Sequence, residues 1–177
     1  TTLKEWPLTE GLYPKSMLVD AIYDELPSDL PSALLDDIRD LTETTQHSGN
    51  FSRIDYRIDR RLRALQLEIA QNAKSPFLVE YLHRLSDVQN ITTIIRRKMH
   101  ELGRDGLTDA LLNAGTLDHT FLEKAHDSGW ESMVTAFKPT EYSQMVADAL
   151  AQVEQQNFLA ILDACGSQYL IEFLQRA

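Results

Sequence analysis

Apolar residues recur three and four positions apart along much of the chain, which is the pattern of one face of an α-helix. The clearest stretch runs between Pro76 and Gly103 and consists of Leu78, Tyr81, Leu85, Val88, Thr92, Ile95, Met99 and Leu102. Ile91 and Ile94 widen its second half, which predicts broader burial there. We expect Ser75 to cap this helix, Pro76 to lie in its first turn and Gly103 to end it. The stretch therefore predicts one long helix packed antiparallel against a neighbour.

The same spacing, with Pro and Gly as punctuation, predicts helices on both sides of this stretch. They are expected over residues 15–26, 31–46, 53–73, 107–112, 118–127, 130–137, 141–164 and 167–177. In this prediction Gly166 breaks the long helix over 141–164, and Ser167 begins the last one. No segment alternates apolar and polar residues as a strand does. The predicted fold class is all-α, a bundle of repeated antiparallel helical units.

Two blocks of sequence recur in the same order, which indicates an internal repeat. Residues 75–84 and 167–176 share five of ten identities, 92 positions apart. Residues 8–21 and 112–125 share a Leu-x-x-Gly motif, then a hydrophobic pair and an alanine. We therefore predict a complete helical unit over residues 1–106 and a second, truncated unit over 107–177.

The second unit stops soon after its last helix begins, so the chain is expected to be part of a longer fold. This predicts an uncovered apolar patch near the C-terminus, formed by residues of the last two helices: Tyr142, Met145, Val146, Ala149, Val153, Tyr169, Leu170, Phe173 and Leu174. Apolar patches of this kind mark interaction surfaces or sites of association. We expect the chain to self-associate through the patch, or the last helix to fray.

Charge and cysteine content narrow the partners and the compartment. The net charge is −10, which argues against nucleic acid because the phosphates would repel the chain. Cys165 is the only cysteine, so no disulfide framework forms and a reducing compartment is favoured. No apolar run approaches the length of a membrane span, and the N-terminus does not resemble a signal peptide.

Two Glu-x-x-His pairs, Glu80 with His83 and Glu123 with His126, are the sharpest chemical candidates. Two such pairs on different helices supply ligands in di-iron carboxylate proteins. Helical periodicity turns all four side chains away from the apolar faces, so we interpret them as solvated surface residues. A helical di-metal oxidase is the alternative from a different class. Cys165 is interpreted as a structural thiol, and no other motif predicts a catalytic residue or a cofactor.

Asp87 and Asn90 lie three positions apart near the apolar face of the long helix. A buried polar pair needs partners, so we expect either a hydrogen-bond network between helices or a site for a partner protein. The basic run Arg96-Arg97-Lys98 follows. It either binds an acidic partner or neutralises the C-terminal end of its own helix.

Several motifs together carry a family resemblance. They are Asp59-x-x-Leu62, Ser75-Pro76-Phe77-Leu78-x-x-Tyr81, Asp87-Val88-Gln89-Asn90-Ile91-x-x-x-x-Arg96-x-Lys98, Leu111-Leu112-Asn113-Ala114-Gly115-Thr116-Leu117 and Thr140-x-Tyr142. On these residues the chain resembles the C subunit of V-type (A/V-type) ATP synthases, which is equivalent to the d subunit of the eukaryotic vacuolar ATPase. The resemblance gives Asp59, Asp87, Asn90, Ile91, Arg96 and Lys98 a structural or partner-binding role as family-motif residues.

The resemblance implies a mechanical function without catalysis or a cofactor. The C subunit is a funnel-shaped fold of three helical units that sits on the membrane rotor ring. It receives the D and F subunits of the central stalk, and so couples ion transport to ATP synthesis or hydrolysis. The expected location is cytoplasmic, peripheral to the membrane within the complex. A generic helical adaptor protein is the remaining alternative.

Overall fold

The computed structural model describes residues 52–176 of the chain. By its contacts the chain divides into two compact units, Thr1–Ile58 and Asp59–Ala177. The second unit, with the helix that leads into it, contains all the features described below. The helices predicted over residues 15–26 and 31–46 lie outside the described residues.

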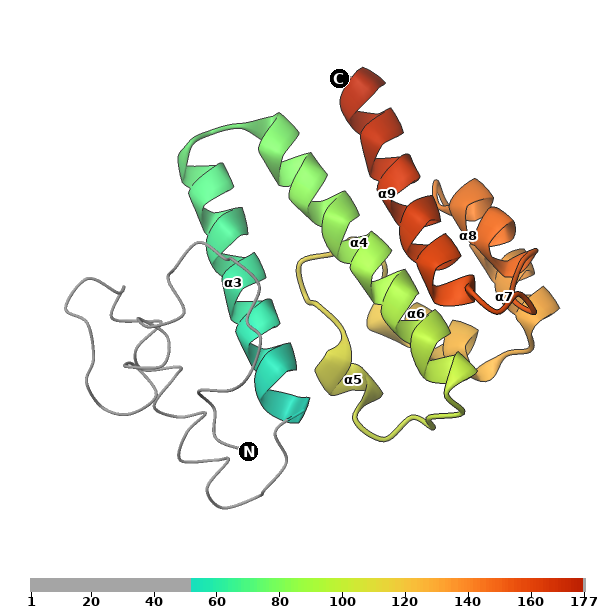
Figure 1. Ribbon diagram of the computed structural model, residues 1–177. Coiled ribbons are helices and arrows are strands. Elements are labelled where there is room, and N and C mark those ends of the chain that lie inside the picture. The colour runs from blue at the N-terminus through green and yellow to red at the C-terminus, as the bar shows by residue number, and fades with distance from the viewer. Residues whose placement is uncertain (1–51, 177) are drawn as a thin grey trace, which may run out of the picture. The chain divides into compact units, whose positions relative to one another are not determined.

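Helices connected by short turns and loops make up the described part of the chain (Figure 1). In chain order they are α3 (Ser52–Asn72), α4 (Pro76–Met99), α5 (Leu107–Ala110), α6 (His119–Asp127), α7 (Trp130–Phe137), α8 (Ser143–Leu150) and α9 (Phe158–Arg176). No strand occurs between residues 52 and 176. The predicted all-α class is confirmed, and the helices expected between residues 53 and 137 are present with small shifts at their ends.

The long helix α4 begins as its sequence predicts and ends earlier. The Ser75 side chain caps it by accepting a hydrogen bond from the Leu78 amide, and Pro76 lies in its first turn. The helix ends at Met99, so the expected end at Gly103 is wrong. Glu101 takes the left-handed conformation with a φ of 53°. The helix closes there because the Glu101 and Leu102 amides donate to the last free carbonyls, a pattern that usually recruits glycine.

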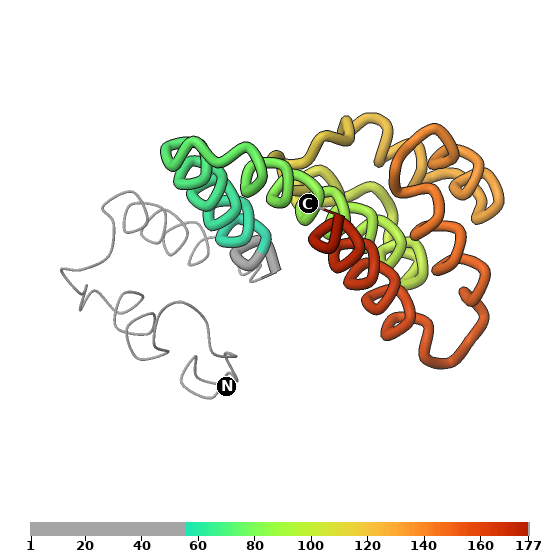
Figure 2. Tube along the Cα trace, turned by 90° about the horizontal axis from the view of Figure 1, so that it is seen from above, coloured from blue at the N-terminus to red at the C-terminus, as the bar shows by residue number. Residues whose placement is uncertain are grey.

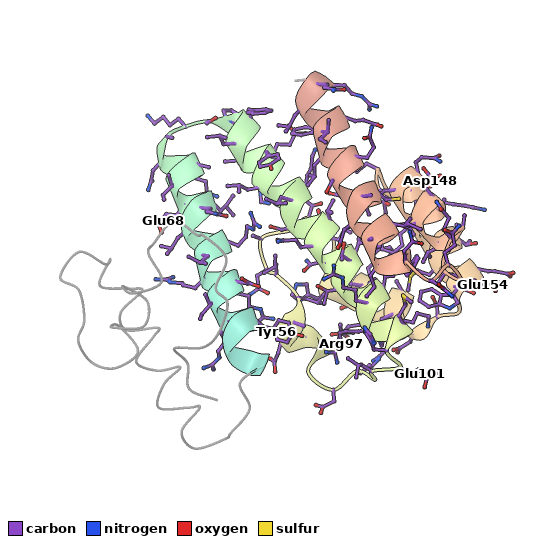
Figure 3. All side chains as sticks on the ribbon, viewed as in Figure 1. Tyr56, Glu68, Arg97, Glu101, Asp148 and Glu154 are labelled. Atoms are coloured by element: carbon purple, nitrogen blue, oxygen red, sulfur yellow. The ribbon has the colours of Figure 1, made fainter. Side chains whose placement is uncertain are left out.

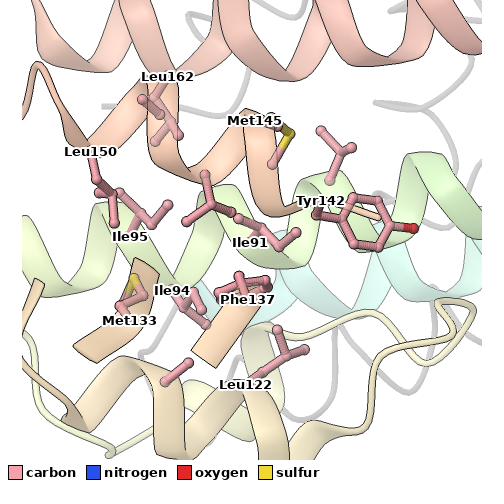
Figure 4. Packing of buried hydrophobic residues seen from close by; sticks show 14 of the residues in the cluster. Ile91, Ile94, Ile95, Leu122, Met133, Phe137, Tyr142, Met145, Leu150 and Leu162 are labelled. Atoms are coloured by element: carbon pink, nitrogen blue, oxygen red, sulfur yellow. The ribbon is translucent and has the colours of Figure 1, made fainter. Parts of the chain in front are cut away.

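The hydrophobic core is built around the second half of α4, as the wide apolar face there predicts. Ile91, Ile94 and Ile95 are fully buried (Figure 4). Buried side chains from the surrounding helices and loops complete the core: Leu107, Leu111, Leu122, Met133, Phe137, Tyr142, Met145, Val146, Leu150, Phe158 and Leu162. Helix α4 is thus the central element on which the shorter helices pack.

The break between α8 and α9 is displaced from the predicted one. The chain turns between Leu150 and Phe158, and α9 then runs through Gly166 without interruption. Leu150 and Phe158 are both buried in the same core, and the turn lets α8 and α9 pack against each other. The expected helix over residues 141–164 and the start at Ser167 are therefore wrong. The turn contains neither Gly nor Pro, so the sequence carries no breaker signal there.

Gly166 serves close packing. A Cβ atom at this position would lie 2.8 Å from Cγ1 of Val88 on α4, far inside a normal contact. The missing side chain therefore allows α9 to approach α4 closely. Figures 1 and 2 show α9 running antiparallel alongside α4.

Packing between neighbouring helices covers most of the predicted C-terminal patch. Tyr142, Met145, Val146 and Ala149 are buried, because α8 packs against α7 and α9. Tyr169 and Leu170 pack against the core, and the Phe173 ring stacks on Phe77 with centroids 5.8 Å apart. Of the predicted residues, Leu174 remains exposed, at 46%. The patch as predicted is therefore wrong for every residue named here except Leu174.

Candidate functional site

The resemblance motif falls mainly on α4 and on the loop that faces it. Asp87 and Asn90 are completely buried, as is Ile91, which belongs to the hydrophobic core. Facing them is the irregular segment 111–118, between α5 and α6, which contains Gly115 and Thr116. This segment lacks regular secondary structure, so its backbone groups need partners from elsewhere.

The Asp87 carboxylate accepts hydrogen bonds from three residues distant in sequence. The Thr116 amide lies 2.9 Å from each carboxylate oxygen, and the Thr116 hydroxyl donates to Oδ2 at 2.6 Å. The Leu117 amide donates to Oδ1 at 3.0 Å, and the Tyr142 hydroxyl donates to Oδ2 at 2.9 Å. A buried carboxylate is tolerated only when its lone pairs are satisfied, and these donors satisfy them. Asp87 thereby joins α4, the loop and the start of α8.

Gly115 allows the loop to reach Asp87. A Cβ atom on Gly115 would lie 2.2 Å from Oδ1 of Asp87 and 3.4 Å from Nδ2 of Asn90. Any side chain there would push the loop away from both polar residues. Gly115 is therefore as necessary to the site as the polar residues are, although no single pattern in the sequence identifies it as a neighbour of Asp87.

The buried Tyr142 hydroxyl is satisfied by the same carboxylate. The residue is 1% exposed, and its hydroxyl has Asp87 as partner. Burial, and then the negative charge of Asp87, raise the pKa of Tyr142 far above its usual range. The hydroxyl therefore keeps its proton and remains a donor to the carboxylate.

Asn90 and two histidines bind further backbone groups of the loop. Asn90 accepts from the Leu112 amide at 2.7 Å and donates to the Leu112 carbonyl at 3.0 Å. His119 shares that carbonyl at 3.1 Å, and His83 reaches the Ala114 carbonyl at 2.6 Å. Each contact replaces a partner that a regular helix would have supplied. The loop therefore depends on α4 side chains for its shape.

Both basic motif residues also bind within the chain. Arg96 donates to both carboxylate oxygens of Asp163 on α9, at 2.7 Å each. Lys98 donates to the His126 carbonyl at 2.9 Å and lies over the Trp130 ring, 5.2 Å from its centroid. That carbonyl belongs to the last turn of α6, whose carbonyls have no partner within the helix. Lys98 thus caps a neighbouring helix, which neither alternative for the basic run foresaw.

Arg97 and Asp59 lie apart from the Asp87 network. Arg97 donates to the carbonyls of Gly103 and Asp105 and shapes the turn after α4. Asp59 is exposed on α3. Burial lowers the pKa of Arg63 on the same helix, and the charges of Tyr81 and Asp59 act against this lowering. The charge of Asp59 therefore acts on Arg63 of the same helix.

Arg84 is a residue that the sequence reasoning missed. It donates to Glu80, to Glu141 and to the Tyr169 hydroxyl, and it lies 4.5 Å from the centroid of the Phe173 ring. Burial alone would lower the pKa of Arg84, but the carboxylates of Glu80 and Glu141 raise it overall. The contacts join α4 to α9 and to the start of α8. The sequence signal that could have identified Arg84 is a basic residue one helical turn before Asp87.

The Glu-x-x-His pairs do not form the solvated surface that was predicted. Glu80 is exposed and binds Arg84, but His83 is half-buried against the loop. His126 is 6% exposed, and its Nδ1 lies 3.2 Å from the Asp127 carboxylate. Glu123 accepts from the Thr108 hydroxyl at 2.8 Å. The interpretation as solvated surface is wrong for both histidines, because the loop and α6 pack onto α4.

The chemistry open to the described residues is limited. No group of three or more His, Cys, Asp or Glu side chains that could hold a metal ion occurs among them. Cys165 is half-buried, and burial raises the pKa of its thiol, which disfavours the reactive thiolate. None of the helices in the described part is both long enough and apolar enough to cross a membrane. The hydrogen bonds of Asp87 and Asn90 hold the loop in place.

Comparisons with known proteins relate the chain to ATPase subunits. The family described as ATP synthase (C/AC39) subunit matches residues 8–177. The chain is 26% identical over 168 residues to the C subunit of the V-type sodium ATPase of Enterococcus hirae, an alignment that spans 95% of the chain and 51% of that protein. It is 26% identical over 104 residues to the C subunit of the A-type ATP synthase of Methanobrevibacter smithii, an alignment that spans 59% of the chain and 27% of that protein.

These relatives are longer than the chain. The chain spans about half the length of the Enterococcus protein that it matches. No solved structure gives a significant match. The alignments therefore relate this chain to a part of each relative.

Proposed function

The chain belongs to the ATP synthase (C/AC39) subunit family, and from this membership we propose that it is a non-catalytic connector in a rotary V-type ATP synthase or ATPase. The proposed role is to link the central stalk, through its D and F subunits, to the membrane rotor ring. It thereby couples ion transport to ATP synthesis or hydrolysis. The proposed place is the cytoplasmic side of the membrane, as a peripheral part of the complex.

The family match over residues 8–177 is the observation that carries this proposal. The structure adds physical support, because a part that transmits force needs elements that do not slide past one another. Asp87 joins α4 to the loop and α8, and Arg84 and Arg96 join α4 to α9. The contacts of Asp87, and that of Arg84 with Tyr169, join buried or half-buried groups, and such directional contacts resist sliding more than apolar contacts alone. The Arg96–Asp163 ion pair is exposed and adds less.

We also propose that the chain contains two related helical units, residues 1–106 and 107–177. The recurrence of residues 75–84 at 167–176 supports this division. The two copies differ in local structure, because Ser75 caps the start of α4 whereas Ser167 lies inside α9. The antiparallel packing of α4 and α9 brings Phe77 of the first copy against Phe173 of the second.

A co-purification experiment tests the connector role. The tagged full chain is mixed with the purified D–F pair, and separately with the detergent-solubilised rotor ring, from the organism that supplies the chain. We expect the chain to retain at least one of them on the affinity resin. A tagged acidic helical protein of similar size and net charge is the matched control, because the charge of −10 attracts basic proteins nonspecifically.

Salt separates the two kinds of binding. Attraction between exposed charges weakens as ionic strength rises, whereas a packed interface is retained. Binding by the chain that survives a salt concentration at which the control binds nothing supports the connector role. If the chain captures neither the D–F pair nor the ring, or no more of either than the control does, the proposed role is wrong.

A further inference from the structure

Helix α3 is attached to the rest of its unit differently from the other helices. Among the described residues, the hydrophobic core and the partly buried side chains packed on it include no residue of α3. Ala70, beside the turn into α4, is its only buried residue between positions 56 and 72. Directly before it on α3, Ile69 is 67% exposed. Leu62, Leu65 and Leu67 are half-buried, so the apolar packing of α3 is tightest close to the turn.

Farther from the turn, two arginines reach across to the neighbouring elements. The Arg60 Nε donates to the Leu111 carbonyl at 2.7 Å, and its guanidinium also donates to the Thr108 carbonyl. The Arg63 guanidinium donates to the Gln89 side chain on α4 at 2.7 Å. We refer to Arg60 and Arg63 with these three acceptors as the arginine clamp. Both arginine side chains are half-buried.

Arg60 of the clamp binds backbone carbonyls that lack hydrogen-bond donors of their own. Thr108 lies in the four-residue helix α5 and Leu111 directly follows it, so their carbonyls have no partner within that helix. A cation near the C-terminal end of a helix also complements the partial negative charge there. Such hydrogen bonds are strong but directional and short in range. Removing the donors therefore removes the attachment at this place.

The turn that follows α3 supplies a pivot. Residues 73–75 connect α3 to α4, and Lys74 takes a left-handed conformation with a φ of 50°. The Lys74 and Ser75 amides donate to the last carbonyls of α3, so the turn is itself well ordered. Figures 1 and 2 show α3 and α4 diverging from this turn.

We infer that residues 59–72 of α3 form an arm that is held to the rest of its unit by the arginine clamp. When the clamp is removed, the arm swings about residues 73–75 while the core around α4 stays intact. The inference rests on the contacts of α3 and does not depend on the connector role. It adds a conformational freedom that a rigid bundle of the same helices would lack.

Distances between spin labels measure this motion directly in the full chain. One label is placed on α3 and one on α8, with Glu68→Cys and Asp148→Cys in a Cys165→Ser background; both labelled positions are exposed (Figure 3). The reference pair is Lys124→Cys with Asp148→Cys, which joins two helices that belong to the core. The clamp is removed by Arg60→Gln with Arg63→Gln.

The matched control removes two positive charges elsewhere, with Lys138→Gln and Arg176→Gln, both at exposed positions. We expect loss of the clamp to broaden and lengthen the distance distribution between α3 and α8 and to leave the reference pair unchanged. The charge control should change neither. An unchanged α3–α8 distribution shows that other contacts hold α3. Broadening of the reference pair as well shows that the clamp supports the whole unit, and either result overturns the inference.

Discussion

At the scale of single residues, the chain concentrates its buried polarity around one carboxylate. Asp87 has no cation among its hydrogen-bond partners in the described part of the chain. Two backbone amides and two hydroxyls stabilise it instead. Hydrogen bonds to a charged group are stronger than neutral ones, and the buried surroundings strengthen them further. The loop is therefore held in part through its own backbone amides, which donate to Asp87 on α4.

Replacing Asp87 tests this arrangement. Asp87→Ala leaves the amides of Thr116 and Leu117 and the Tyr142 hydroxyl without an acceptor. Each buried group left unsatisfied costs about 1–3 kcal/mol, so we expect a loss of about 3 kcal/mol in the free energy of unfolding. Chemical denaturation monitored by circular dichroism measures the change. Asp87→Asn should cost less, because its amide can donate to the two hydroxyls.

Asp148→Ala is the matched control for Asp87→Ala. Asp148 is an exposed carboxylate on α8 whose side chain accepts a hydrogen bond from Gln144, one turn away. Surface substitutions of this kind change stability by less than about 0.5 kcal/mol. A loss for Asp87→Ala no larger than the loss for Asp148→Ala would mean that the loop does not depend on the carboxylate.

At the scale of elements, periodicity predicted most helices, and the apolar faces of all of these except α3 meet one core. It placed α3, α4, α6 and α7 correctly and marked Asp87 and Asn90 as polar residues on an apolar face. It could not supply the partners of Asp87, because Thr116 and Tyr142 lie 29 and 55 positions away in the sequence. Local rules also failed where tertiary contacts decided the outcome, as at the turn between α8 and α9.

Gly166 shows why a local rule failed. An isolated glycine lowers helix propensity by about 1 kcal/mol relative to alanine, which is why the sequence pattern predicts a break there. The close approach of α9 to Val88 makes the small residue necessary instead. The glycine is therefore determined by the contact between two helices, and the helix tolerates its cost.

A double-mutant cycle separates these two effects. In the wild-type background, Gly166→Ala forces a methyl group against Val88, and overpacking of this kind costs about 1–3 kcal/mol. In a Val88→Ala background the methyl group has room, so the same change should gain up to about 1 kcal/mol from helix propensity. Thermal unfolding of the four proteins gives the coupling energy. Equal effects of Gly166→Ala in both backgrounds would show that α9 and α4 do not need the glycine.

At the scale of the whole molecule, the described part leaves apolar side chains exposed where α4 begins and α9 ends. Phe77 and Leu78 on α4 are 40% and 43% exposed, and Ile171 and Leu174 on α9 are 48% and 46% exposed. The stack of Phe77 on Phe173 shows that these two helix ends adjoin. These exposed residues gather where α4 begins and α9 ends, and of the four only Leu174 belongs to the patch predicted from the sequence.

Self-association through these residues is the expected outcome in solution. Exposed apolar residues that gather at one place favour association, because association removes their surface from water. Sedimentation velocity over a range of concentrations should show the wild-type chain shifting to larger species as concentration rises. Ile171→Glu with Leu174→Glu should abolish the shift, because two charges cannot be buried there without a large cost. The control Ala164→Glu with Gln175→Glu adds the same charges at other exposed positions of α9 and should leave the association unchanged. A wild-type chain that stays monomeric at every concentration would show that the apolar residues at these helix ends do not mediate association, and equal effects of the two double substitutions would attribute the association to charge alone.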